Sequence, residues 1–147
     1  TIATACGYAD GSARRGVVFL GDLALLHDLN SLQAAADRDL IVVVINNDGG
    51  GIFSYLPIRR HENVFERFFG TPHGLSFEHA ARMFALDYAR PETIDEYRST
   101  LEKAIASNDG ALIEIRTDRT ENYEEQRRLL VALADRTTRA IEDGGHA

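Results

Sequence analysis

An α/β fold is predicted by the sequence: a three-layer, doubly wound and mostly parallel sheet with helices on both faces. Two short runs, residues 16–21 (GVVFLG) and 40–45 (LIVVVI), are continuously apolar, which is typical of strands covered on both faces. The segment between them predicts a helix from about Asp22, because apolar residues recur at four- and three-residue intervals: Leu25, Leu29, Leu32 and Ala36. A strand, a helix and a strand in this order form a crossover unit with parallel strands.

The other predicted elements complete the sheet and its helical layers. Short strands are expected at 86–89 and 111–115, the latter nearer an edge because it is less apolar, and helices over the ranges 1–13, 63–69, 76–84 and 122–141. Thr93 opens a further helix with a capping box, in which the side chain of Glu96 reaches back. That helix should bury one face, Ile94, Tyr97, Leu101 and Ile105. In the last helix, five residues are expected to face inward: Leu129, Leu130, Leu133, Ala140 and Ile141.

Composition places the chain among globular proteins with a single domain, residues 1–147. It is 44% hydrophobic and 27% charged, and a chain of this length can bury a core without disulfides. Cys6 is the single cysteine, so no internal disulfide can form, which fits a reducing compartment. The net charge of −7 argues against a nucleic-acid partner, and the apolar runs are too short to insert into a membrane. We therefore expect a cytoplasmic protein.

Two loops that follow the predicted parallel strands carry the residues of a candidate site. Gly21, Asp22 and Leu23 follow the first strand, and the NNDGGG segment at 46–51 follows the second. Ligands of open parallel sheets bind beyond the carboxyl ends of the strands, so Asp22 and Asn47 should face one cavity if these strands are neighbours. Each loop alone has a simpler explanation, because aspartates often cap helices and Asn-Asp-Gly is a common turn. Together, at matched strand ends, the loops favour a binding site.

Oxygen ligands dominate this pair of loops. Asp22 offers a carboxylate and Asn47 an amide oxygen, while the glycines allow backbone carbonyls to approach a ligand closely. Such ligands suit Mg²⁺, which shares its coordination shell with phosphate and water, and the first amides of the following helix can bind an anion. The loops therefore predict a diphosphate bridged by a divalent cation, with the choice between Mg²⁺ and Mn²⁺ left open.

This pairing of GD with NN at the end of an apolar strand resembles the signature of the thiamine-diphosphate superfamily of decarboxylases, acetolactate synthases and transketolases. The resemblance implies the thiamine-diphosphate-binding fold, with Mg²⁺ held by Asp22, Asn47 and the backbone carbonyl of Gly49. It also implies a set of residues beside the cofactor: Gly21, Asp22, Leu23, Asn47, Gly49, Gly50, Gly51 and Ile52. The sequence GDL in place of the usual GDG is a departure from the superfamily.

Longer segments narrow the resemblance to the MenD family, the 2-succinyl-5-enolpyruvyl-6-hydroxy-3-cyclohexene-1-carboxylate synthases of menaquinone biosynthesis. Four segments carry it: GDLALLHDLNSL, VINNDGGGIFSYLP, FGTPH and EIRTDR. The resemblance implies decarboxylation of 2-oxoglutarate and addition of the resulting carbanion to isochorismate. It also implies that Ile52, Phe53 and Leu56 lie beside the reactive ring of the cofactor and the substrate. From the residues alone, these three are equally well explained as hydrophobic anchors for the loop.

The resemblance covers only the C-terminal part of the diphosphate-binding domain, so that domain is expected to be incomplete at its N-terminus. In the family, a glutamate in the pyrimidine-binding domain of a second subunit promotes removal of the thiamine proton. We therefore expect no catalytic residue within this chain, a homodimer for the whole enzyme, and no turnover by the chain alone. Two alternatives stay open: another thiamine-diphosphate-dependent 2-oxoacid decarboxylase or acetolactate-synthase-like enzyme, and a non-catalytic α/β interaction module.

The remaining polar residues have simpler explanations. His27 is expected on a helix surface, and the other histidines lack zinc-site spacing: His61, His73 and His79. Arg59 and Arg60 are candidates to meet an acidic substrate, although most such pairs are solvated. Arg116 and Arg119 flank the end of the last predicted strand, where a contact with the site is an alternative, but pairing with Asp118 or Glu121 is favoured. Lys103, the only lysine, lies in a predicted helix, which excludes a lysine-bearing phosphate loop.

Overall fold

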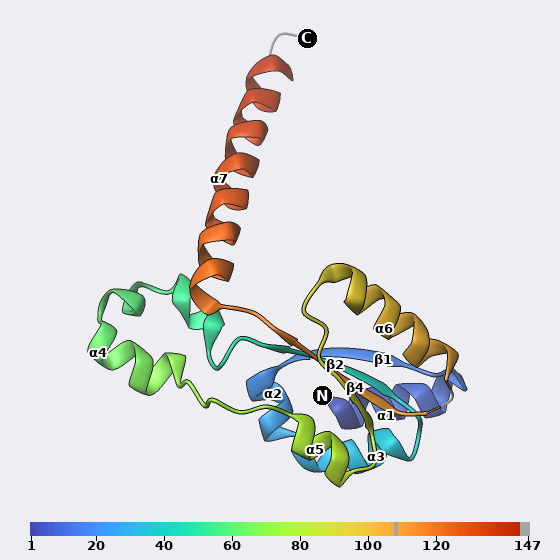
Figure 1. Cartoon of the computed structure of the whole chain (residues 1–147). Helices are drawn as coiled ribbons and strands as arrows, with labels where there is room; N and C mark the ends of the chain where they lie inside the picture. The colour runs from blue at the N-terminus through green and yellow to red at the C-terminus, as the bar shows by residue number, and fades with distance from the viewer. Residues whose placement is uncertain (108, 145–147) are drawn as a thin grey trace.

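A parallel sheet of four strands lies at the centre of the part of the chain that the computed structural model describes, residues 1–107 and 109–144 (Figure 1). The strand order is β1-β2-β4-β3, with all neighbours parallel. The strands are β1 (Val17–Gly21), β2 (Ile41–Asn46), β3 (Asp87–Ala89) and β4 (Ala111–Arg116). The predicted α/β class and parallel sheet are confirmed.

Helices cover both faces of the sheet and make it the middle of three layers (Figure 1). On one face lie α1 (Ile2–Ser12), α2 (Asp22–His27), α3 (Leu32–Ala36) and α5 (Glu78–Met83). They form the main core, whose fully buried members include Ile2, Leu25, Leu32, Leu40, Val42, Val44, Ala81 and Leu112. The opposite face is covered by α6 (Ile94–Ala106), whose Tyr97, Leu101 and Ala104 pack on Ile41, Val43, Ala111 and Ile113.

The positions of β1 and β4 in the sheet differ from the prediction. β1 is an edge strand and not a strand covered on both faces: Phe19 is 58% exposed, because the residues of α6 pack on β2 and β4. β4 lies between β2 and β3, although it was predicted nearer an edge. β4 contains one fully buried charged residue, Glu114. Its burial is tolerated because both carboxylate oxygens accept hydrogen bonds.

Two predicted helices are less regular than their apolar spacing suggests. The helix expected from Asp22 is divided into α2, a 3-10 turn at Leu29–Ser31 and α3. In α6, Thr93 Oγ1 accepts a hydrogen bond from Glu96 N (3.2 Å), but Glu96 reaches back to the amide of Glu92 (2.8 Å). Two residues of its predicted buried face are exposed, Ile94 and Ile105.

A lobe of short helical turns lies beyond the carboxyl ends of β1 and β2 (Figure 1). Its elements are 3-10 turns at Gly51–Tyr55 and Pro57–Arg60, α4 (Glu62–Phe65) and a π-helical turn at Glu66–Gly70. The last helix, α7 (Arg119–Gly144), begins beside this lobe and then projects away from the sheet.

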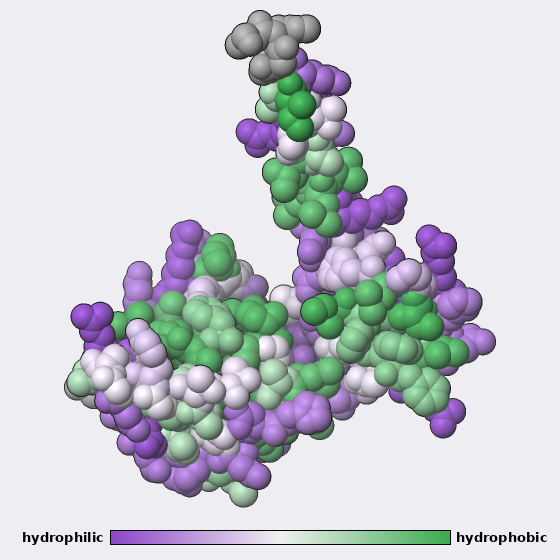
Figure 2. Space-filling model, turned by 180° about the vertical axis from the view of Figure 1, so that it is seen from behind, coloured by the Kyte–Doolittle hydropathy of each residue, from purple (hydrophilic) through white to green (hydrophobic). Residues whose placement is uncertain are grey.

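The apolar residues of α7 do not face a core. All five that were predicted to turn inward are exposed: Leu129, Leu130, Leu133, Ala140 and Ile141. Figure 2 shows hydrophobic side chains gathered along the projecting helix. The periodicity of α7 was read correctly as helical, but no described element of the chain packs against its distal part.

Candidate functional site

The carboxyl ends of β1 and β2 bring the two predicted loops together. Gly21 of β1 is opposite Ile45 of β2 in the register, so Asp22 and Asn46 each follow at the same edge of the sheet. A direct hydrogen bond joins the loops, because Gly49 N donates to Asp22 Oδ2 over 2.7 Å. The expectation that the two loops meet at one edge is therefore confirmed. Of the two residues predicted to face one cavity, Asn47 lines the cavity of about 660 Å³ described below, whereas the buried Asp22 does not line it.

Asp22 is a buried carboxylate, and most acceptor positions of its two oxygens are occupied by contacts within the protein. Its side chain is 4% exposed, and Oδ1 accepts a hydrogen bond from Leu23 N over 2.8 Å. Oδ2 accepts the bond from Gly49 N and lies 3.0 Å from His73 Nε2. His73 was considered in the sequence only as a zinc ligand, and its contact with Asp22 was not predicted.

The two asparagines at the end of β2 point in different directions. Asn46 turns into the core, where its Nδ2 donates to Glu114 Oε1 over 2.7 Å. Asn47 lies against Gly51, at which an added Cβ would come within 2.5 Å of Asn47 Nδ2. Asn47 Oδ1 is buried, and no described residue provides it with a hydrogen-bond partner. Asn47 therefore presents a free acceptor at the strand end, although it makes no hydrogen bond to Asp22.

Glycines at 49–51 are required by contacts within the protein. Gly49 has φ +122°, and a Cβ there would lie 2.0 Å from the carbonyl oxygen of Gly70. At Gly50 a Cβ would lie equally close to the carbonyl oxygen of Phe69, and Gly50 N donates to Gly70 O over 2.7 Å. The glycines thus permit close approach of the 69–71 backbone, a use that differs from the predicted approach of a ligand.

The segment that follows this lobe is held by Asp48. Asp48 Oδ1 accepts hydrogen bonds from Gly74 N (2.7 Å) and His73 N (3.0 Å). The bond from Gly74, followed by the bond from His73, holds the pKa of Asp48 below its usual value. Asp48 itself adopts φ 61°, in the left-handed region of backbone conformation. The FGTPH segment is therefore part of the candidate site, and its geometry could not be predicted from local sequence.

Glu114 holds the C-terminal end of the segment that follows the lobe, at Phe77. Burial raises the pKa of this carboxyl, but hydrogen bonds from Phe77 N, Asn46, Tyr88 and Arg116 together leave it below the usual value. Arg116 Nε donates to Glu114 over 3.2 Å and Arg116 Nη2 to Leu75 O over 2.8 Å. The predicted pairing of Arg116 with Asp118 or Glu121 is therefore wrong.

The apolar residues after the glycines divide into an anchor and two exposed side chains. Phe53 packs edge-on against Phe69, with ring centroids 5.7 Å apart. Ile52 is 73% exposed and Leu56 is 48% exposed. Only Phe53 therefore acts as an anchor of the loop, and Ile52 and Leu56 remain available to a ligand.

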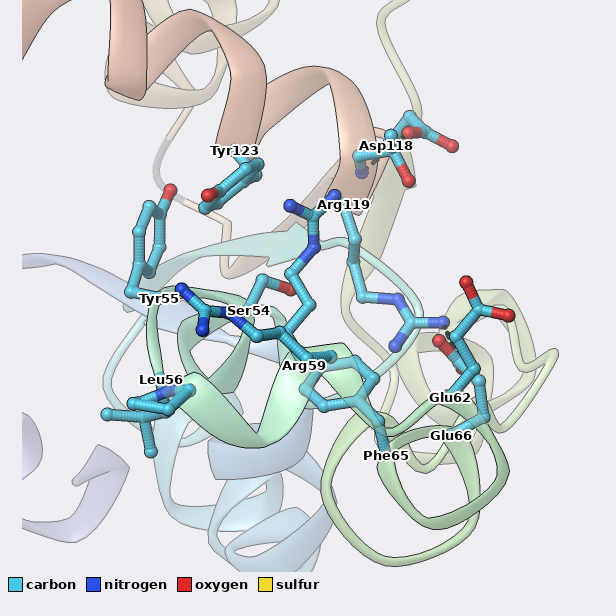
Figure 3. Close-up of a pocket in the computed structure, with 13 residues that line it drawn as sticks. Ser54, Tyr55, Leu56, Arg59, Glu62, Phe65, Glu66, Asp118, Arg119 and Tyr123 are labelled. Carbon is cyan, nitrogen blue, oxygen red and sulfur yellow. Dashed lines mark hydrogen bonds and ion pairs between the residues drawn. The ribbon is translucent and has the colours of Figure 1, made fainter.

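Arginines line a cavity of about 790 Å³ between the lobe and the start of α7 (Figure 3). The Arg59 guanidinium lies 3.8 Å from the centroid of the Tyr123 ring, and Arg119 Nη2 pairs with Glu66 Oε2 over 2.9 Å. The predicted partners of Arg119, Asp118 and Glu121, are thus replaced by Glu66. Arg60 lines the same cavity. A second cavity, of about 660 Å³, is lined by residues that include Asn47, Gly51, Ile52 and Arg119.

Three further observations concern residues outside these loops and cavities. His27 is exposed on α2, as predicted. Within residues 1–107 and 109–144, no group of three or more His, Cys, Asp or Glu side chains is placed to hold a metal ion. In the same residues no helix combines the length and the apolar character needed to cross a membrane.

Residues 1–115 match the family model described as "Thiamine pyrophosphate enzyme, C-terminal TPP binding domain". The chain is also similar to two curated 2-succinyl-5-enolpyruvyl-6-hydroxy-3-cyclohexene-1-carboxylate synthases. The protein from Rubrobacter xylanophilus is 51% identical over 88% of this chain and 23% of its own length. The protein from Salinibacter ruber is 47% identical over 98% of this chain and 24% of its own length. The chain thus spans about a quarter of the length of these relatives.

Solved structures support the fold independently. The thiamine diphosphate-dependent 4-hydroxybenzoylformate decarboxylase of Rhodococcus jostii RHA1 superposes with a TM-score of 0.67 at 21% identity, over 78% of this chain and 22% of that one. The benzoylformate decarboxylase of Polynucleobacter necessarius gives a TM-score of 0.66 at 17% identity, over 80% and 22% of the two chains. At these identities the likeness concerns the fold alone.

Proposed function

The chain belongs to the family of C-terminal thiamine pyrophosphate-binding domains of thiamine pyrophosphate enzymes, and from this premise we propose that the edge formed by β1 and β2 binds Mg²⁺ and the cofactor's diphosphate. The observation that carries the proposal is the hydrogen bond from Gly49 N to Asp22 Oδ2, which joins the two strand-end loops. Mg²⁺ prefers oxygen ligands and shares its shell with phosphate, so one edge that gathers a carboxylate, an amide and carbonyls suits it.

The chemistry of the residues at this edge fits a divalent cation and a diphosphate. Asn47 Oδ1 is a buried acceptor without a partner among the described residues, and such an atom is costly unless something binds it. Asp22 Oδ1 accepts only one hydrogen bond within the described chain, so it retains acceptor capacity. Together with the carbonyl of Gly49, these atoms form the proposed metal ligands. Mn²⁺ has similar ligand preferences and is an alternative ion.

The neighbouring residues are assigned to the cofactor and substrate. Gly21 and Leu23 flank Asp22, and Gly50, Gly51 and Ile52 follow the metal-binding carbonyl, so we assign them to contacts with thiamine diphosphate. Ile52 and Leu56 are exposed apolar side chains beside this edge and would exclude water from the reactive ring. Phe53 is assigned beside the substrate, although its packing on Phe69 shows that it also anchors the loop.

By similarity to the synthases, we propose decarboxylation of 2-oxoglutarate, with release of CO₂, and addition of the remaining four-carbon unit to isochorismate in menaquinone biosynthesis. Thiamine diphosphate supplies an electron sink for this chemistry when it is bound. This chain contributes the half of the site that grips the diphosphate and metal. The group that removes the thiamine proton is assigned to the pyrimidine-binding domain of a second subunit in a cytoplasmic homodimer, so the chain alone should not turn over.

Thermal unfolding with and without Mg²⁺ and thiamine diphosphate tests the binding proposal. A ligand present at 100 times its Kd stabilises the folded state by about 2.7 kcal/mol. For a domain near this size, such a gain raises Tm by roughly 5–10 °C. The Asp22→Asn variant should lose the shift, whereas Asp87→Asn, at the opposite end of the sheet, should retain it.

Absence of any shift in the unaltered chain would contradict the proposal and favour a non-catalytic interaction module. An equal shift in the Asp22→Asn variant would place the ligand elsewhere. Product formation from 2-oxoglutarate and isochorismate by the chain alone would contradict the half-site assignment.

A further inference from the structure

The two carboxylate oxygens of Asp22 are in different environments. Oδ2 receives Gly49 N at 2.7 Å and faces His73 Nε2 at 3.0 Å, while Oδ1 receives only Leu23 N at 2.8 Å. A carboxylate oxygen has two good acceptor positions. Both positions of Oδ2 are therefore used by the protein, and Oδ1 keeps one.

The contacts of the His73 ring assign its tautomer. Leu75 N donates to His73 Nδ1 over 3.0 Å, while Asp48 Oδ1 lies 3.6 Å from Nδ1, too far for a hydrogen bond, so Nδ1 is assigned as an acceptor without a proton. In the neutral ring the proton is then on Nε2, the nitrogen that faces Asp22 Oδ2. The hydrogen bond thus runs from His73 to Asp22, and both ring nitrogens are engaged.

His73 is also held in place by contacts that do not involve Asp22. Asp48 Oδ1 accepts a hydrogen bond from the backbone N of His73 over 3.0 Å. Its imidazole lies edge-on to the ring of Phe77, with centroids 6.3 Å apart, and Phe77 is 2% exposed. The position of the donor is therefore set by the surrounding loop and core.

We propose that His73 is a positioning residue, which fixes the carboxylate of Asp22 so that Oδ1 alone is presented to the metal ion. This inference rests on the proposed function and adds a residue to it. Hydrogen bonds to a ligating carboxylate set its orientation, and their removal typically costs 10–100-fold in metal affinity. Oδ1 is the oxygen that would hold the ion, because an ion at Oδ2 would have to displace Gly49 N or His73.

The test is titration of the chain with Mn²⁺ in the presence of thiamine diphosphate, with free and bound Mn²⁺ measured by electron paramagnetic resonance. His73→Phe keeps a ring against Phe77 but has no donor, whereas His73→Gln retains an N–H donor. His79→Phe is the matched control, because His79 is an exposed histidine on α5. We expect His73→Phe to weaken Mn²⁺ binding by about 10–100-fold and to alter the spectrum of the bound ion. His73→Gln should restore most of the affinity.

Unchanged affinity in His73→Phe would overturn the inference, and so would equal losses in His73→Phe and His73→Gln, since packing and not donation would then be responsible. If circular dichroism shows that His73→Phe does not fold, His73→Ala takes its place with the same two outcomes. The proposed function fails separately: in that case the unaltered chain itself binds no Mn²⁺ with thiamine diphosphate.

Discussion

Replacement of Glu114 by glutamine should destabilise the fold while changing the side-chain volume very little. The carboxylate is fully buried in β4 and accepts hydrogen bonds on both oxygens. Oε2 receives Tyr88 OH at 2.8 Å and Phe77 N at 2.9 Å, and Oε1 receives Asn46 Nδ2 at 2.7 Å. Glutamine offers one acceptor oxygen and one donor amide, so it cannot satisfy both sides.

The size of the effect follows from the donors that face each oxygen. If the new amide faces Phe77, the hydroxyl of Tyr88 can rotate to accept, but the Phe77 N–H is left unsatisfied, at a cost of about 1–3 kcal/mol. The remaining bonds lose their ionic acceptor, and neutral hydrogen bonds are roughly half as strong. We expect a total loss of about 2–4 kcal/mol, a large part of the 5–15 kcal/mol typical of a domain.

Urea unfolding followed by circular dichroism measures this loss as a shift of the midpoint at constant m value. The control is Glu102→Gln, because Glu102 is an exposed residue of α6. The control should change the free energy of unfolding by less than about 0.5 kcal/mol. A Glu114→Gln variant as stable as the control would refute the view that ionic hydrogen bonds hold this segment.

Three further predictions concern the same region. The pKa of Glu114 in the folded chain lies below its ordinary value of 4.5. The ionised carboxylate therefore stabilises the fold fully above pH 4.5, and this stabilisation is lost as the pH falls through the folded-state pKa. The free energies of unfolding of the unaltered chain and of Glu114→Gln, measured against pH, should converge in acid. Gly49→Ala should destabilise by about 2 kcal/mol or more, because φ is +122° and Gly70 O lies 2.0 Å from the new Cβ, whereas Gly7→Ala, in open space on α1, should stabilise by about 0.5–1 kcal/mol in thermal unfolding. Ile52→Ala should leave the free energy of unfolding within about 0.5 kcal/mol but reduce the Tm shift by thiamine diphosphate; an unchanged shift would remove Ile52 from the proposed site.

The fold class could be predicted from the sequence because the central strands carry a signal that depends only on neighbouring residues. Leu40 to Ile45 are continuously apolar, and β2 is buried on both faces. Position within the sheet has no such local signal. β1 is as apolar as β2 yet lies at an edge, and β4 contains Glu114 yet lies in the interior. In β4 the cost of burying a charge is offset by hydrogen bonds from residues distant in sequence.

The candidate site, like the fold, could be predicted from the sequence only in part. The parallel register brings Asp22 and Asn47 to one edge, and this follows from strand order and chain direction. The contact between His73 and Asp22 joins residues 51 positions apart, and no spacing rule predicts it. The partner of Arg119, Glu66, lies 53 positions away and was missed for the same reason. Glu114 is only two residues from Arg116 and was passed over in favour of the acidic residues that follow the strand.

Three acidic residues hold the segment 70–77, two that follow strands and one, Glu114, that lies within β4, and each uses a different donor. Asp22 takes the side chain of His73, Asp48 takes the backbone N–H groups of His73 and Gly74, and Glu114 takes the N–H of Phe77. The position of this segment is therefore set by carboxylates of β4 and of the two loops that follow β1 and β2. Because Asp22 also belongs to the proposed metal site, the same hydrogen bonds that order the segment prepare one carboxylate oxygen for the cation. Folding of the 70–77 segment and metal affinity should accordingly be coupled.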